Sequence, residues 1–198
     1  GLAIGPDSGD KSGKNYLHVA YGIYGDTGRE DNDNQVILQY DIEKLNETAK
    51  VHKQSAMHTS GPEERNKYFL FTGNTTYGVQ NLEYDEYTGD YIVSVYTGHK
   101  EKFPNYTTFV IDGKIAPVTV SGKKFLTLKN CGMIKAGISG YYQYLGGVEI
   151  GAMGMHSVGN GVFYIVDPQW GDKENLYVYS ELYKIDESDK NELFKKVD

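Results

Sequence analysis

The sequence predicts an all-β chain, arranged as about three four-stranded antiparallel blades of a β-propeller-like fold. Its 198 residues include 18 tyrosines and 24 glycines but only 5 prolines, a composition typical of short strands joined by tight turns. Two strand-like segments recur along the chain at nearly constant spacing. Helical periodicity is nearly absent, although residues 41–51 could form a short helix. Repeated four-stranded units are the pattern of a propeller.

The repeat is carried by two apolar segments in each unit. The first segment covers residues 15–21, 90–96 and 162–166. Its first aromatic residues, Tyr16, Tyr91 and Phe163, are separated by 75 and 72 residues. The second segment closes each time on an aspartate, at Asp41, Asp112 and Asp186. These aspartates are 71 and 74 residues apart, so both segments keep the same period.

The middle unit shows the expected strands best. They are residues 79–84, 90–97, 106–111 and 124–128. A hairpin turn at residues 85–89 joins the first two, with Gly89 near the position that needs positive φ. In the first unit, residues 67–72 form the outer strand. The third unit is expected to contain residues 152–158, 162–166, 176–185 and 192–197.

The repeats therefore cover about residues 1–75, 76–130 and 150–198 of a single domain, 1–198. Alternation within the strands predicts a buried core. Its members are Leu38, Tyr40, Ile92, Val95, Phe109, Ile111, Phe163 and Ile165. Propellers usually close with four to eight blades. Three blades thus indicate part of a larger or dimeric propeller, and the expected partners are missing blades or a second copy. A β-sandwich is the alternative fold.

Composition excludes some functions. The net charge of −7 argues against nucleic-acid binding, which needs a basic face. The sequence has no apolar run of the roughly 20 residues that a membrane-spanning helix requires. Cys131 is the lone cysteine, so neither an internal disulfide nor a cysteine-based zinc site is expected.

Two stretches of the middle unit carry a family resemblance. Residues 77–91 read YGVQNLEYDEYTGDY and residues 103–113 read FPNYTTFVIDG. They resemble a bacterial repeat domain often found C-terminal to a calcineurin-like metallophosphoesterase domain. The resemblance covers most of the chain and implies a propeller-like fold, and an extracytoplasmic bacterial location is favoured over a cytoplasmic one. The phosphoesterase signatures Asp-x-His and Gly-Asn-His have no counterpart, so any such activity would belong to another part of a parent protein.

Three long loops, at residues 25–34, 98–105 and 167–175, are expected at one end of the units. Long loops on one end of a rigid scaffold are frequent places for binding. The candidate ligand-binding residues on these loops and the adjacent strand start are Tyr77, Gln80, Arg29, Lys100, Lys102, Phe103 and Trp170. Their aromatic, cationic and amide groups suit a carbohydrate, another small molecule or a peptide. The alternative is solvated loops, with Trp170 packed between blades.

Four acidic or basic side chains suggest chemistry. Asp31 and Asp33 alternate with asparagines, which suits calcium, although an acidic surface turn is the ordinary interpretation. No other cofactor is expected. Glu83 and His156 fall on matching inner strands, where they could act as an acid/base pair or be polar residues around a water-filled axis.

The leading functional hypothesis is a non-enzymatic module that binds a ligand or scaffolds a partner. No serine or cysteine lies in a nucleophile motif such as Gly-x-Ser-x-Gly. The alternative is a hydrolase whose acid/base residues, Glu83 and His156, line the propeller channel. A purely structural assembly module is a third possibility.

Overall fold

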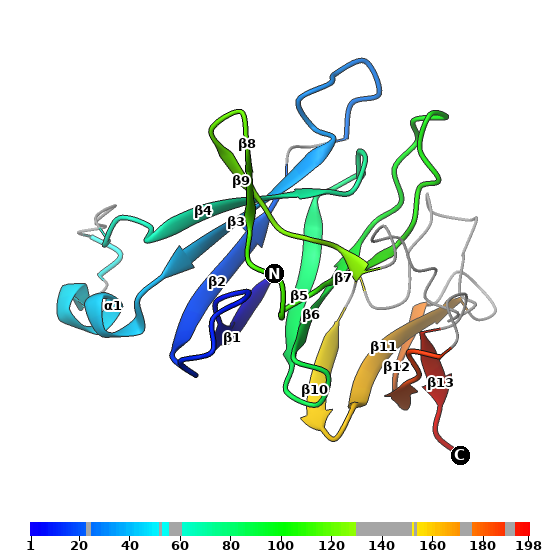
Figure 1. Cartoon of the computed structure of the whole chain (residues 1–198). Helices are drawn as coiled ribbons and strands as arrows, with labels where there is room; N and C mark the ends of the chain where they lie inside the picture. The colour runs from blue at the N-terminus through cyan, green and yellow to red at the C-terminus, as the bar shows by residue number, and fades with distance from the viewer. Residues whose placement is uncertain are drawn as a thin grey trace.

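The computed structural model describes residues 1–22, 25–51, 53–55, 61–129, 152, 154–170, 176–188 and 193–198, with residues 167–170 and 176 described by their backbone alone. These residues form three open, largely antiparallel sheets and one short helix, shown in Figure 1. The all-β prediction is confirmed. No helix among the described residues is long and apolar enough to cross a membrane.

The first sheet has six strands in the order β1-β2-β3-β4-β9-β8. Their bounds are β1 Leu2–Pro6, β2 Asn15–Tyr21, β3 Asn34–Tyr40, β4 Asn66–Phe71, β8 Val118–Val120 and β9 Lys123–Phe125. All neighbours pair antiparallel except β4 and β9, which are parallel. Helix α1 (Ile42–Thr48) follows β3, and the Asp41 carboxylate caps it by accepting a 3.0 Å hydrogen bond from the Glu43 N–H.

The middle sheet is a three-stranded meander of β5 (Val79–Asp85), β6 (Asp90–Val95) and β7 (Thr108–Ile111). Its first hairpin closes as predicted, with Gly89 at φ +79°. The Asp85 carboxylate holds this turn by accepting from the Thr88 N–H at 3.1 Å and the Thr88 hydroxyl at 2.8 Å. The third sheet contains β10 (Met155–Gly159), β11 (Val162–Trp170), β12 (Leu176–Ile185) and β13 (Phe194–Lys196), in that order.

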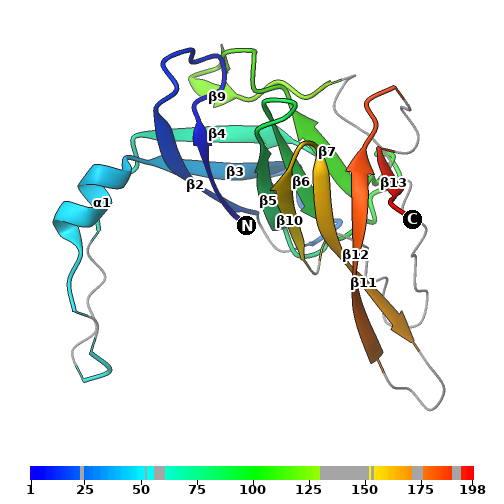
Figure 2. The ribbon, with the colours of Figure 1, turned by 90° about the horizontal axis from the view of Figure 1, so that it is seen from below.

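The sheets lie one after another, with the middle sheet between the other two (Figures 1 and 2). One apolar cluster joins the first and middle sheets and includes Leu70, Leu82 and Phe109. A second joins the middle and third sheets and includes Ile92 and Phe163. Because both faces of the middle sheet are covered, every residue of β6 and β7 is buried. Strands β1 and β10, from the first and third sheets, both contact β5.

The predicted core is right in the middle and third sheets and wrong in β3. Ile92, Val95, Phe109, Ile111, Phe163 and Ile165 are buried. Leu38 and Tyr40 are only partly buried, because β3 turns its other face inward. That face carries Ile37 between two glutamines, Gln35 and Gln39. The amide nitrogens of both glutamines have partners inside: Gln35 donates to the Thr72 hydroxyl at 3.0 Å and Gln39 to a ring nitrogen of His18 at 3.2 Å.

The fourth strand predicted for the middle unit belongs mostly to the first sheet. Residues 123–125 form β9, which pairs with β4, and the Phe125 and Phe69 rings lie 5.7 Å apart. The end of the predicted segment reaches the middle sheet, where Leu128 bridges to Ile111 and the Thr127 carbonyl accepts from the Asp112 N–H at 2.8 Å. Strands β1 and β8 were not expected. In the third unit, β11 continues to Trp170, so residues 167–170 of the predicted loop at 167–175 belong to a strand.

Candidate functional site

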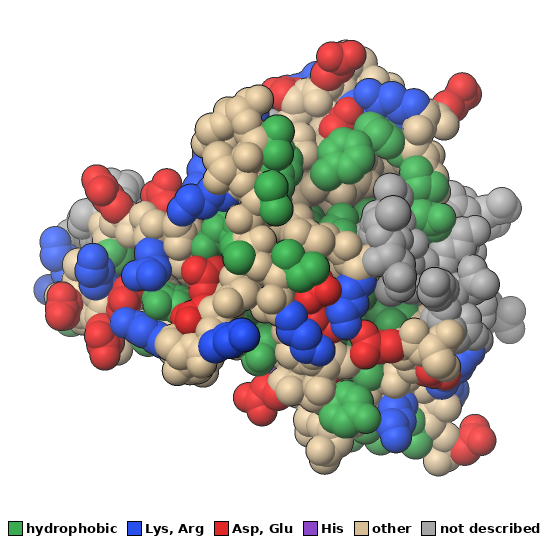
Figure 3. All heavy atoms as spheres, viewed as in Figure 1, with side chains coloured by type: hydrophobic (Ala, Val, Ile, Leu, Met, Phe, Trp, Pro, Cys, Tyr) green, Lys and Arg blue, Asp and Glu red, His purple; other side chains and the backbone are tan. Residues whose placement is uncertain are grey.

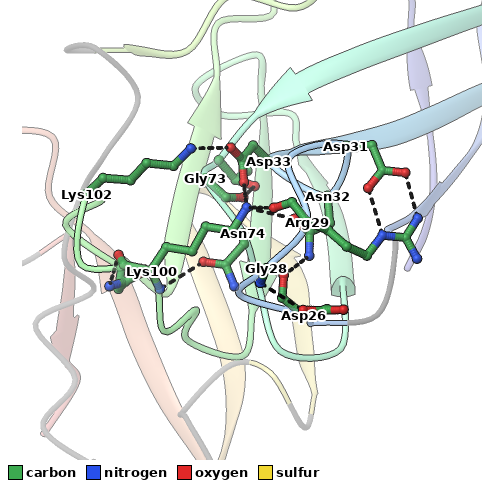
Figure 4. Close-up of polar contacts among 12 residues, drawn as sticks. Asp26, Gly28, Arg29, Asp31, Asn32, Asp33, Gly73, Asn74, Lys100 and Lys102 are labelled. Carbon is green, nitrogen blue, oxygen red and sulfur yellow. Dashed lines mark hydrogen bonds and ion pairs between the residues drawn. The ribbon is translucent and has the colours of Figure 1, made fainter.

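Two of the three predicted loops meet at one end of the molecule, and Lys100 joins them (Figure 4). Its side chain is only 5% exposed. The Lys100 ammonium contacts the Arg29 carbonyl oxygen, the Asn32 Oδ1 atom at 2.9 Å and the Asp33 carboxylate. A lysine ammonium has three donors, so these three oxygens satisfy it completely.

Further contacts fix the two loops around this ion pair. Asp33 also forms an ion pair with Lys102, whose Nζ atom lies 3.1 Å from the second carboxylate oxygen of Asp33. The Lys100 N–H donates to Asn74 Oδ1 at 3.2 Å, and the Asn105 amide donates to the Lys100 carbonyl at 3.0 Å. A buried charge is costly unless it is paired and hydrogen-bonded. The complete set of partners therefore makes this end of the molecule a fixed rather than an adaptable surface.

The loop at residues 25–34 is also ordered by its own side chains. The Asp26 carboxylate accepts from the Gly28 N–H at 2.8 Å, which forms a tight local turn. Asn32 donates to the Asp26 carbonyl at 2.8 Å. Arg29 and Asp31 form a bidentate pair at 2.8 and 2.6 Å, and this hydrogen bonding lowers the pKa of Asp31.

The two loops enclose an open hollow of about 480 Å³. Its lining is Thr27, Gly28, Arg29, Glu30, His99, Lys100, Glu101 and Lys102. Acidic and basic groups alternate around it, and its cations already pair with Asp31 and Asp33. The hollow thus offers oriented hydrogen-bond donors and acceptors without an excess of positive charge.

The remaining ligand-binding candidates lie elsewhere. Phe103 packs on Gly73, where a Cβ atom would clash, and on the Phe71 ring at 5.6 Å, edge to face. Tyr77 is exposed and contacts the Tyr96 ring at 5.2 Å, while the Gln80 amide donates to the Tyr77 carbonyl at 3.0 Å. The side chain of Trp170 lies outside the described residues. Of the predicted ligand-binding residues, the hollow therefore brings together Arg29, Lys100 and Lys102.

The two predicted calcium ligands are occupied by cations of the chain itself. Asp31 pairs with Arg29, and Asp33 pairs with Lys100 and Lys102. Within the part of the chain that the structure describes, no three His, Cys, Asp or Glu side chains converge as metal ligands would. A calcium ion at these carboxylates would have to displace three positive side chains.

The predicted acid/base candidates are in contact. Glu83 on β5 and His156 on β10 lie on strands that contact each other, with the Glu83 Oε1 atom 3.2 Å from His156 Nδ1. The same Oε1 accepts a 2.8 Å hydrogen bond from the Ser157 N–H. His156 is 74% exposed and Glu83 18% exposed. The carboxylate therefore connects the middle and third sheets as well as approaching the imidazole.

Sequence reasoning missed a buried polar group between the first and middle sheets. The His18 ring is buried, with Nδ1 3.2 Å from the Tyr91 hydroxyl and Nε2 3.2 Å from the Gln39 amide nitrogen. Since the Gln39 Oε1 atom accepts from Asn66 at 2.8 Å, its amide nitrogen must donate to His18 Nε2. The network thus assigns a neutral ring protonated on Nδ1. Burial lowers the pKa of His18 to about 4. Its alternating position in β2, between inward Tyr16 and Ala20, was the available signal.

The surface gives no sign of a nucleic-acid site on the face shown in Figure 3. Acidic and basic side chains are interspersed across the described part of that face. In comparisons with known proteins, no family model, curated protein or solved structure matches the chain.

Proposed function

We propose that the chain is a non-enzymatic, β-propeller-type binding module that holds a neutral carbohydrate in the hollow between residues 25–34 and 98–105. The propeller interpretation is supported by the order of the sheets. The three-stranded middle sheet lies between the six-stranded and four-stranded sheets, and β1 and β10 both contact β5. The resemblance of residues 77–91 and 103–113 to a bacterial propeller-like domain agrees with it.

One observation carries the binding proposal: buried Lys100, through its contacts with Asn32 and Asp33, holds both loops in place before any ligand binds. Preorganised loops reduce the ordering cost of binding. The ligand class follows from the charges. Because Arg29 and Lys102 are already neutralised by carboxylates, an anion gains little there. A neutral sugar can use the remaining guanidinium donors of Arg29 and the oxygens of Thr27, Glu30 and Glu101.

The proposal is tested by titrating the chain against a panel of neutral and acidic mono- and oligosaccharides in a calorimeter. We expect saturable binding of a neutral sugar and a loss of about tenfold or more in Arg29→Ala, since hydrogen bonds to charged groups contribute about 1.5–3 kcal/mol. Arg65→Ala is the matched control, because Arg65 lies over the Tyr16 ring and is not part of the lining of the hollow. Absence of binding across the panel, or equal losses in both variants, would refute the proposal.

The contact between Glu83 and His156 favours a second candidate, a hydrolase with these residues as its acid/base pair. Phosphate-ester and glycoside substrates should be screened with the wild-type chain and Glu83→Gln, which keeps an acceptor for the Ser157 N–H. Turnover that disappears in Glu83→Gln would replace the binding proposal with this one. Under the binding proposal, neither protein turns over any substrate.

A further inference from the structure

The outer face of the first sheet is largely apolar and exposed, with Lys67 and Lys123 lying over the Phe69 ring. Leu2 and Ile4 of β1 are 64% and 59% exposed, and they are in register with Val19 and Leu17 of β2. Tyr21 and Phe71 continue the face across β2 and β4. Val118 and Val120 extend it onto the β8–β9 hairpin, where hydrophobic side chains reach the surface in Figure 3.

The outer face of the third sheet has exposed apolar side chains beside the polar His156, Ser180 and Lys184. Tyr164 of β11 is 45% exposed and pairs with Leu182 of β12. Val178 lies on the same face and is exposed, as is Val158 of β10. Soluble monomers rarely leave continuous apolar patches beyond a few hundred Å². The two ends of the stack of sheets therefore both present surfaces suited to another sheet.

The chain itself contains two examples of such packing. The inner face of the first sheet packs on the middle sheet, and the opposite face of the middle sheet packs on the third. At both junctions the inner strands are neighbours, β1 with β5 and β5 with β10. A third junction of the same kind would place the third sheet of one copy on the first sheet of another.

We infer that the chain forms a two-fold dimer in which the outer face of each first sheet packs on the outer face of the partner's third sheet, closing a ring of six sheets. The area favours this arrangement over a single contact. With strands about 4.8 Å apart and same-face residues about 6.8 Å apart, one such face offers on the order of 400 Å² of sheet. The ring uses two faces of each copy and so reaches roughly the 800 Å² per partner of a stable interface. The inference is independent of the proposed carbohydrate site.

The oligomeric state tests it. Sedimentation equilibrium of the full chain is expected to give twice the chain mass, and both Ile4→Lys and Tyr164→Lys are expected to give monomers, since each lysine would be buried unpaired at both junctions of the ring. Val51→Lys is the matched control. Val51 is 81% exposed outside the three sheets, and its variant should remain dimeric.

Mixing the two variants distinguishes the ring from other arrangements. Ile4→Lys and Tyr164→Lys together retain one intact junction, about half of the wild-type interface. An equimolar mixture should therefore form a heterodimer more weakly than the wild-type chain dimerises, while neither variant associates alone. If instead the first sheet of one copy packed on the first sheet of another, Tyr164→Lys would remain dimeric, and this result would overturn the inference. A wild-type chain that stays monomeric at high concentration, or grows into larger assemblies, would overturn it as well.

Discussion

Lys100 and His18 are buried cation-forming side chains that the chain uses in opposite ways. Lys100 is surrounded by oxygens from Arg29, Asn32 and Asp33, so its charge is stabilised. His18 lies between neutral hydrogen-bond partners, so its uncharged form is favoured. One residue thus fixes the loop end, and the other fixes the junction of two sheets without a charge.

For Lys100, we predict that Lys100→Met lowers the free energy of unfolding by about 3–5 kcal/mol, because it leaves the buried Asp33 carboxylate with one partner fewer. The neighbouring Lys102→Met variant removes an exposed partner of the same carboxylate and should cost less than about 1 kcal/mol. Urea unfolding measures both. Similar small losses in the two variants would show that the burial of Lys100 does not govern the loops.

For His18, we predict acid destabilisation. The pKa of the ring is about 4 in the folded chain, against 6.5 for an ordinary histidine. The unfolded chain therefore binds the proton first, and stability that is complete above pH 6.5 is lost as the pH falls toward 4. The lowered pKa corresponds to about 3 kcal/mol. The nearby Asp7 carboxylate moderates the loss, since it raises the pKa.

The His18 prediction is checked by measuring the free energy of unfolding between pH 7 and 4 for the wild-type chain and His18→Gln. The variant should lose most of the dependence on pH in this range. His99→Gln is the control, because His99 lies on an exposed loop, and it should behave as the wild type does. An unchanged slope in His18→Gln would assign acid sensitivity to other groups.

At the scale of strands, alternation in the sequence predicts a face only when the inward residues are the apolar ones. It succeeds for β11, where Phe163 and Ile165 are buried, and fails for β3, where glutamines occupy the inward positions. The glutamines require partners on β2 and after β4, which no local pattern reveals. Pairing of β9 with β4 is equally non-local, because it joins segments more than 50 residues apart.

The candidate site was predictable only where it depends on local sequence. Loop length pointed to residues 25–34 and 98–105, because it can be read from strand spacing alone. The ion pair of Lys100 with Asp33 could not be predicted from the sequence, because the two residues are 67 positions apart. The sequence instead suggested a metal site at Asp33. An acidic run is visible in the sequence, whereas the distant lysines that contact it in the folded chain are not.

The buried strands give a further prediction. Phe109→Ala and Phe163→Ala should each lower the free energy of unfolding by about 3–5 kcal/mol, because both rings are fully buried in the two apolar clusters. Tyr87→Ala is the control, because Tyr87 is 64% exposed on the hairpin turn, and it should cost less than about 1 kcal/mol. Chemical denaturation measures these values. Losses below about 1 kcal/mol in both phenylalanine variants would contradict the observed strand faces.

On the scale of the whole molecule, the stacked sheets should differ in local stability. The middle sheet is covered on both faces, and every residue of β6 is buried. The β8–β9 hairpin is exposed along β8 and joins the first sheet through a short parallel pairing with β4. Local opening requires less energy where few apolar contacts are broken. The molecule should therefore open from the hairpin end long before its middle sheet separates.

Native-state hydrogen exchange measures this difference. We expect the amides of β6 to exchange at least about a hundredfold more slowly than those of β8, which corresponds to about 3 kcal/mol in opening free energy. Added urea should accelerate exchange in β6, because its opening is global unfolding, and should leave β8 nearly unaffected, because its opening exposes little new surface. Equal protection of the two strands would mean that the sheets unfold as one unit, and that burial on both faces gives the middle sheet no additional local stability.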